Sequence, residues 1–211
     1  MRTHHKIALG LTVPWVALLG YDFAHRVSEG TGTWVTDSDL VESRVFSVTT
    51  TVAIGAMFAS LAWVVHAERA RFADAPRAAR WARRPLLVSL IALTVGFCLV
   101  SPTQVALGVK SGLFYDISGL VAFVAISGLS LSALTVGLAS VRSMALGYGG
   151  RILALILPAV LLGAAAALYA DAPVSPVFGT FVALVGLATL GLGLPGQAVG
   201  ARGVVDGQHH P

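Results

Sequence analysis

Residues 117–139 read ISGLVAFVAISGLSLSALTVGLA, a stretch of 23 residues without one charged side chain. About 20 apolar residues are enough for a helix to cross the hydrocarbon core of a bilayer. The rest of the chain has the same character, because 56% of its 211 residues are hydrophobic, only 11% are charged, and the mean hydropathy is +0.81. Soluble proteins average about 25% charged residues. The sequence therefore predicts an integral membrane protein.

Five further apolar runs accompany this one, and none shows the in-and-out alternation of a barrel strand. Without barrel strands, only helices can satisfy the backbone hydrogen-bonding groups inside lipid. We therefore expect an all-α fold, a bundle of six transmembrane helices. Residues 1–196 should form one six-helix transmembrane domain and residues 197–211 a flexible cytoplasmic tail. The first run is interpreted as a retained span, since no small-residue cleavage site follows it. The expected spans are Ile7–Phe23, Val45–Val65, Pro85–Val100, Ile117–Ala139, Ile152–Ala170 and Val177–Leu194.

The basic residues predict the orientation. With both termini cytoplasmic, 11 of the 14 Lys and Arg fall in cytoplasmic segments, six of them in HAERARFADAPRAARWARR at residues 66–84. Cytoplasmic loops carry such an excess. The formal charge of +4 is thus interpreted as a sign of topology and not of nucleic-acid binding. The basic loop anchors this topology, and contact with anionic lipid headgroups stays open as an alternative.

The acidic residues gather on the other side. Asp22, Glu42, Asp116 and Asp171 each lie near the outer end of a different expected span. Ionisable groups close to the apolar core are costly and suggest function, so we expect the first three to form an outer cup and to act as the catalytic acids. Structural alternatives remain for three of the four. Asp22 can pair with Arg26 four residues later, Asp39 and Glu42 resemble a helix-capping pattern, and Asp171 suits a turn.

Aromatic residues surround these acids. Such rings can form the aromatic belt of a membrane interface, or they can line a binding pocket. An apolar enclosure favours the protonated form of a carboxyl group, and ring faces attract a cation. Together these properties suit protonation of an alkene or epoxide, followed by carbocation cyclisation of a prenyl chain. The candidate substrate-binding residues are Tyr21, Phe23, Trp34, Phe46, Phe114, Tyr115 and Tyr169.

Several classes of site are missing from the sequence. The single cysteine, Cys98, lies within the third run, so no disulfide or thiolate metal site is expected. The histidines show no metal-ligand spacing, because His25 and His66 are expected at opposite membrane faces and the other four lie near the chain ends. There is no P-loop, GxSxG or HExxH motif, and no aspartate cluster for a diphosphate. We therefore expect no cofactor and no metal.

Three features carry a resemblance to known proteins: the six-span plan, SDLVESRVF at residues 38–46, and LVSPTQ at 99–104 followed by FYDISGLVAF at 114–123. They resemble a broad prokaryotic family of small six-helix membrane proteins of unknown function. Within that layout the chain also resembles the small actinobacterial integral-membrane terpene cyclases of drimane (drimentine) type. That resemblance implies intramembrane carboxylates that act without metal. The chain lacks the Trp-Glu signature of the related fungal cyclases, so the resemblance does not say which acid acts.

The leading hypothesis from the sequence is a multi-pass cell-membrane terpene cyclase that acts on a prenylated small molecule. Asp116 or Asp22 would donate the proton, and Glu42 or the other Asp would tune that acid or accept the final proton. The alternatives are a non-enzymatic binder of lipids or small molecules, a small transporter, and a structural partner without a site. Pro14 and Pro158, inside the first and fifth runs, keep the transporter open, because transporters use broken helices. Expected partners are membrane lipids and a lipophilic substrate, with no nucleic acid; a homo-oligomer stays open.

Overall fold

The structure, a computed structural model, describes residues 1–35, 41, 43–170 and 177–193, with the backbone alone for residues 166–170 and 177. All regular elements in this part of the chain are helices and none is a strand, which confirms the all-α class. The expected tail at 197–211 lies outside the described residues. The elements are α1 (Thr3–Glu29), α2 (Arg44–Ala67), α3 (Arg69–Ala73), α4 (Arg77–Val95), the π-helix η2 (Gly96–Val100), α5 (Ser101–Leu107), α6 (Leu113–Ser140), α7 (Gly147–Ala154), α8 (Ile156–Ala170) and α9 (Val177–Ala188).

Each of the six apolar runs falls on a helix, but the helices differ in length. Five stretches are long and apolar enough to cross a membrane: Thr3–Glu29, Arg44–Ala67, Arg77–Leu107, Leu113–Ser140 and Gly147–Ala165. The sixth helix, α9, is apolar but has only 12 residues. At 1.5 Å per residue it extends about 18 Å, against a hydrocarbon thickness of about 30 Å. The expected sixth span is therefore shorter, in the described residues, than the sequence suggested.

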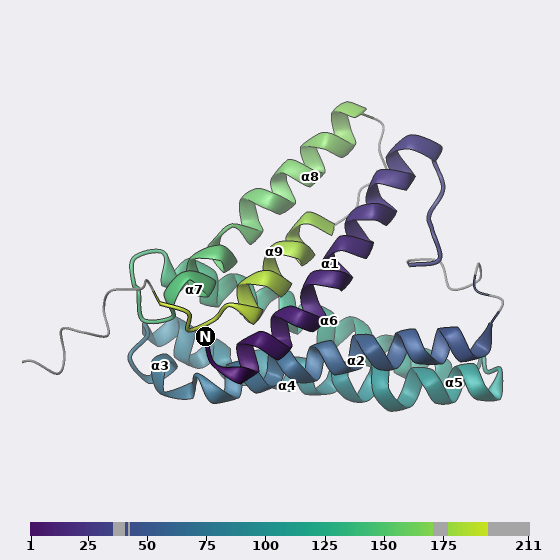
Figure 1. The fold of residues 1–211 in the computed structure, drawn as a ribbon, viewed down its shortest axis with the longest axis horizontal. Helices are drawn as coiled ribbons and strands as arrows, with labels where there is room; N and C mark the ends of the chain where they lie inside the picture. The colour runs from purple at the N-terminus through teal and green to yellow at the C-terminus, as the bar shows by residue number, and fades with distance from the viewer. Residues whose placement is uncertain (36–40, 42, 171–176, 194–211) are drawn as a thin grey trace, which may run out of the picture.

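The helices form two groups that meet at one end of the molecule (Figure 1). In the first group, α2, the continuous helix α4–η2–α5, and α6 pack side by side. In the second group, α9 packs against α1 on one side and against α7 and α8 on the other. The two groups diverge in Figure 1 as they leave the end marked by the N-terminus. The buried hydrophobic core lies where they join, around Met57, Leu61, Leu90, Leu187 and Leu190.

Both ends of the described chain lie at the junction of the two groups. His5, near the start of α1, contacts the carbonyl oxygen of Ala188 at the end of α9, with 3.2 Å between Nδ1 and O. The segment after α9 stays there, because Tyr148 N donates to the carbonyl of Leu192 at 2.8 Å. The loop 66–84 and residues 141–151 lie at the same end (Figure 1). We call this end, which holds most of the arginines, the basic end.

Prolines shape two of the long helices in different ways. Pro14 lies inside α1, which continues through it, so the expected interruption of the first run is wrong. Pro158 lies in the first turn of α8, and α7 ends at Ala154, four residues earlier. A proline ring clashes with the carbonyl of residue i−4 and donates no hydrogen bond. The long apolar segment 147–170 is therefore broken into two helices at Leu155.

Glycine lets α6 and α7 touch backbone to backbone. A Cβ built on Gly137 of α6 would meet the carbonyl group of Leu153 and would come within 2.6 Å of Ala154 N, in α7. Small residues at interfaces between apolar helices permit this kind of close approach. The small residues of GLSLSALTVGLAS at 128–140 are interpreted from the sequence as close helix packing, and the contact at Gly137 agrees with that interpretation.

Gly137→Ala should therefore destabilise the fold. We expect a loss of about 2 kcal/mol of unfolding free energy, because backbone atoms cannot rotate away from the new methyl group. Gly119→Ala on the same helix is the matched control, since no heavy atom lies within 4 Å of its Cβ position. That control should be neutral or up to about 1 kcal/mol more stable, because alanine is the better helix former. Thermal unfolding in detergent measures both, and equal melting temperatures would contradict the close packing.

Candidate functional site

Asp22, one of the three predicted catalytic acids, holds a loop in place. Its side chain is buried, and Oδ1 accepts hydrogen bonds from the backbone N and the hydroxyl of Thr33 at 2.6 and 2.7 Å. Oδ2 accepts from Nε of Arg26 at 2.9 Å, which confirms the predicted i, i+4 pair. Gly30 ends α1 in the left-handed region, with φ of 73°, and this turn brings Thr33 back to Asp22. The contacts of Asp22 thus fit a structural role.

Asp116, the favoured proton donor, lies in the first turn of α6 and is exposed. A carboxylate in that position interacts favourably with the positive end of the helix dipole. The principal packing partners of α6 are α4 and α7, whereas those of α1 are α2 and α9. The described contacts of Asp22 and the exposure of Asp116 do not bring these two acids into one cup.

Glu42, the third predicted acid, lies outside the described residues, as do Asp39 and Asp171. The N-cap of α2 is Ser43, whose hydroxyl accepts from Phe46 N at 3.3 Å. Among the described residues, Ser43 thus caps the start of α2, and the predicted capping pattern of Asp39 and Glu42 lies outside them.

The predicted aromatic residues fall at several separate places. Trp34 and Phe46 pack edge to face, with their ring centroids 5.0 Å apart, and Phe23 packs against Phe178 at 4.9 Å. Tyr21 is exposed and lies near His25, at 6.2 Å between ring centroids. The side chain of Tyr169 is not described. Phe114 and Tyr115 remain, and both line a cavity.

This cavity, which we call the α4–α6 cavity, is a mainly apolar hollow with a volume of about 580 Å³. It lies between α4–η2–α5 and α6. Several of its wall residues, among them Val95, Ile117 and Val121, are also exposed on the outside of the bundle, so the cavity communicates with the surroundings. Its lining is Ala92, Leu93, Val95, Gly96, Phe97, Val100, Ser101, Gln104, Phe114, Tyr115, Ile117, Ser118, Gly119, Val121 and Ala122.

Only a few polar groups enter this apolar wall. Nε2 of Gln104 donates to the hydroxyl of Ser118 at 2.7 Å, and that hydroxyl donates to the carbonyl of Tyr115 at 2.7 Å. Oε1 of Gln104 and the phenol oxygen of Tyr115 have no hydrogen-bond partner among the described residues. The cavity thus combines a mainly hydrophobic surface with a few polar groups: the amide oxygen of Gln104, the phenol of Tyr115 and the hydroxyl of Ser101. Small-molecule sites have this composition.

A π-helix forms one wall of the cavity. Gly96, Phe97 and Val100 belong to η2, where the backbone hydrogen bonds skip one residue more than in an α-helix. Pro102 follows directly, and its ring excludes the normal bond to the carbonyl of Cys98. Inserted π turns inside α-helices occur frequently at functional sites. Gln104 and Phe97 were not among the residues predicted from the sequence to line a site. The one signal for Gln104 was a polar side chain inside an apolar run, four residues before the helix-ending Gly108.

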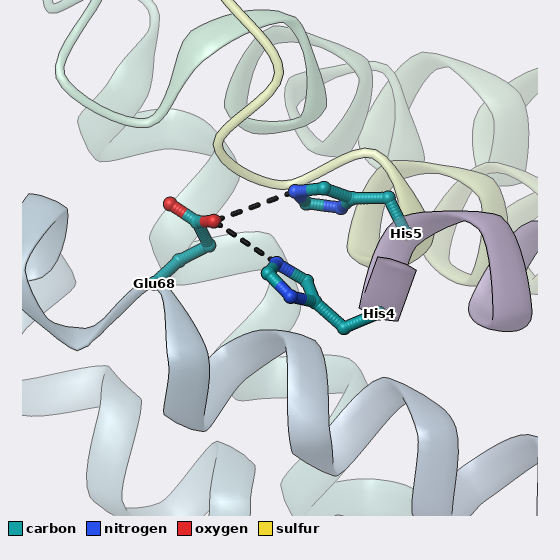
Figure 2. A group of neighbouring side chains, drawn as sticks. All are labelled: His4, His5 and Glu68. Carbon is teal, nitrogen blue, oxygen red and sulfur yellow. Dashed lines mark hydrogen bonds and ion pairs between the residues drawn. The ribbon is translucent and has the colours of Figure 1, made fainter. Parts of the chain in front are cut away.

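A buried polar cluster lies at the basic end (Figure 2). Glu68, between α2 and α3, is 2% exposed, and its Oε1 lies 3.1 Å from Nε2 of His4 and 3.4 Å from Nε2 of His5. Nη1 of Arg2 is 3.1 Å from the same oxygen, and Nε of Arg71 is 3.0 Å from Oε2. The sequence analysis placed His4 and His5 at a terminus and left them unpaired. Their partner is 64 residues away, and only the crossing of α1 over α2 joins them.

No protein-family model, curated protein or solved structure matches this chain. The resemblances described from the sequence therefore gain no support from these comparisons.

Proposed function

We propose that this chain is an integral membrane protein whose basic end faces the cytoplasm. The five long apolar helices support membrane insertion, and the arginines of the loop 66–84 favour a cytoplasmic position for their end. The contact between His5 and Ala188 supports placing both termini on that side, because α9 returns to the level where α1 begins. In this arrangement the chain crosses the membrane an even number of times, and α9 is the last crossing.

We further propose that the α4–α6 cavity binds a lipophilic small molecule. The observation that carries this proposal is the cavity itself: about 580 Å³ of mainly apolar surface, open on the side where lipid would lie. The free oxygens of Gln104 and Tyr115 favour a ligand with a single hydroxyl or N–H group at one end. Such a molecule would reach the cavity from the bilayer without passing through water. The sequence already suggested a non-enzymatic binder of lipids or small molecules as an alternative. The proposed site is now the α4–α6 cavity instead of a cup of acidic residues.

Filling the cavity tests the proposal without disturbing the packing. Gly119 lines the cavity, and no heavy atom lies within 4 Å of its Cβ position. Gly119→Leu should therefore fold normally and weaken ligand binding about tenfold, which is the loss of about 1.4 kcal/mol of apolar contact. The measurement is saturable labelling of the purified protein by a photoreactive farnesol analogue, followed by mapping of the labelled peptide.

The matched control is Gly10→Leu on α1, where the Cβ position is equally open and which does not line the α4–α6 cavity. It should label like the unmodified protein, and the label should map to residues 92–122. Labelling that maps elsewhere, or that Gly119→Leu leaves unchanged, would contradict the proposed binding site.

A second candidate is the terpene cyclase, and one observation favours it. Two of the rings proposed to face a cation, Phe114 and Tyr115, do line the α4–α6 cavity, and Asp116 is the next residue of α6. In this reading Asp116 gives its proton to an alkene or epoxide carbon chain, the chain cyclises, and a base removes one proton to yield an isomer of the substrate. Incubating membranes with prenylated indoles and searching for products of unchanged mass tests this reading. If only unchanged substrate is recovered, the cyclase candidate is rejected and the proposed binding function stands.

A further inference from the structure

The basic end holds a group of side chains that neither proposed function uses. His4 and His5 begin α1, and Glu68 joins α2 to α3; their exposed fractions are 8%, 1% and 2%. Both imidazole rings reach toward the same carboxylate (Figure 2). Each residue offers one donor atom, and the three atoms all lie within 4.8 Å of one another. Nitrogen and carboxylate oxygen are common ligands of zinc.

The spacing of the donor atoms suits a tetrahedral ion. Zinc binds imidazole nitrogen and carboxylate oxygen at about 2.0–2.2 Å. Two ligands of a regular tetrahedron with such bonds lie about 3.3–3.6 Å apart. Oε1 of Glu68 lies 3.1 Å from Nε2 of His4 and 3.4 Å from Nε2 of His5. These two distances match a shared tetrahedral ion to within a few tenths of an ångström, and the donor atoms of the two histidines lie within 4.8 Å of each other.

The surroundings orient two of the ligands. The carbonyl oxygen of Ala188 lies 3.2 Å from Nδ1 of His5 and can only accept, so this nitrogen carries the hydrogen. In the neutral ring, Nε2 then points a lone pair at the carboxylate of Glu68, so two acceptors face each other unless the ring is protonated or a metal cation lies between them. Arg71 binds Oε2 and leaves Oε1 facing the histidines. Metal-binding histidines and carboxylates commonly have such outer hydrogen bonds.

Arg2 competes with a metal ion for Oε1 of Glu68. Its Nη1 lies 3.1 Å from Oε1, but its side chain is 66% exposed and can move away from the cluster. Arg71 stays on the other oxygen and lowers the negative charge that an ion would feel. We therefore expect moderate affinity, with a Kd of about 1 µM, well short of the affinity of a closed four-ligand zinc site.

We propose that His4, His5 and Glu68 bind a zinc-like divalent cation that fastens the start of α1 to the junction of α2 and α3. A water molecule would take the fourth position. Imidazole and carboxylate together suit Zn²⁺ and Co²⁺ better than Ca²⁺ or Mg²⁺. The proposal revises the expectation of a protein without metal, and it is independent of what the α4–α6 cavity binds.

The test uses the full chain, purified without a polyhistidine tag and carrying His209→Ala and His210→Ala in every sample to remove other terminal ligands. Zn²⁺ is titrated by calorimetry, and Co²⁺ reports tetrahedral geometry by its visible absorption. We expect one ion per chain and a higher melting temperature with Zn²⁺ than with EDTA. His4→Gln and Glu68→Gln should weaken Zn²⁺ binding at least about 100-fold. His66→Gln, an exposed histidine near the end of α2, is the matched control and should bind like the parent.

Arg2→Ala separates the metal site from a purely ionic cluster. If Arg2 competes for Oε1, its removal should strengthen Zn²⁺ binding several-fold. A cluster held only by ion pairs predicts no Zn²⁺ binding in the parent and a lower melting temperature for Arg2→Ala. Absence of binding in the parent, or full binding by His4→Gln, would overturn the proposal; the latter result does not depend on whether Glu68→Gln folds.

Discussion

Glu68→Ala, measured in EDTA, is expected to lower the unfolding free energy by about 3 kcal/mol. The carboxylate of Glu68 is the shared partner of Arg2, Arg71 and two histidines. Removing one member of a buried ion pair costs about 3–5 kcal/mol, because the remaining charges stay desolvated without a partner. The lower end of that range applies here, since both arginines reach the surface. Thermal or denaturant unfolding in detergent gives the value.

Asp74→Ala is the control for that variant. Asp74 is an exposed carboxylate of the same loop, six residues further along the chain. Its removal should change the unfolding free energy by no more than about 0.5 kcal/mol. If Glu68→Ala unfolds like this control, the buried cluster does not hold the basic end together.

The second large expected effect is a loss of turnover in Asp116→Asn, if the chain is a terpene cyclase. Asp116→Asn keeps the size of the side chain but has no proton to donate, and a positioned general acid contributes about 10²–10⁴ in rate. Turnover of a prenylated substrate should fall by that factor. The melting temperature should fall only slightly, because Asp116 is exposed and its charge at the start of α6 contributes no more than about 0.3–1 kcal/mol. Tyr115→Phe keeps the ring in the cavity wall and should cost much less. Unchanged turnover in Asp116→Asn would remove this residue as the acid.

Composition and apolar run length predicted the all-helical fold and the approximate place of the apolar helices, but not α3, α5 or the break between α7 and α8. Those signals are local, because every long run in this chain had to become a helix. The i, i+4 pair of Asp22 and Arg26 could be predicted for the same reason. The length of α9 and the π turn at Gly96–Val100 could not be predicted from apolar run length, which indicates neither where a helix ends nor how its turns are wound.

The candidate sites were predicted less completely. Phe114 and Tyr115 were identified as pocket residues and do line a cavity, but Gln104 reaches it from a different helix. The buried cluster joins His4 and Glu68 across 64 residues of chain. No spacing rule within one helix can find such a pair, because the crossing of two helices creates it. The acids were selected because they lie near the outer ends of the expected spans. Position along a helix does not determine which way a side chain faces.

The contact between His5 and Ala188 imposes an order on biosynthesis. The two residues are 183 positions apart, so the ribosome has made at least residues 1–188 before they can meet. Until then the first helix lacks the backbone carbonyl that binds its histidine. Chains that stall before residue 188 would lack this contact. The contact between the start of α1 and the end of α9 is therefore made only after α9 has been synthesised.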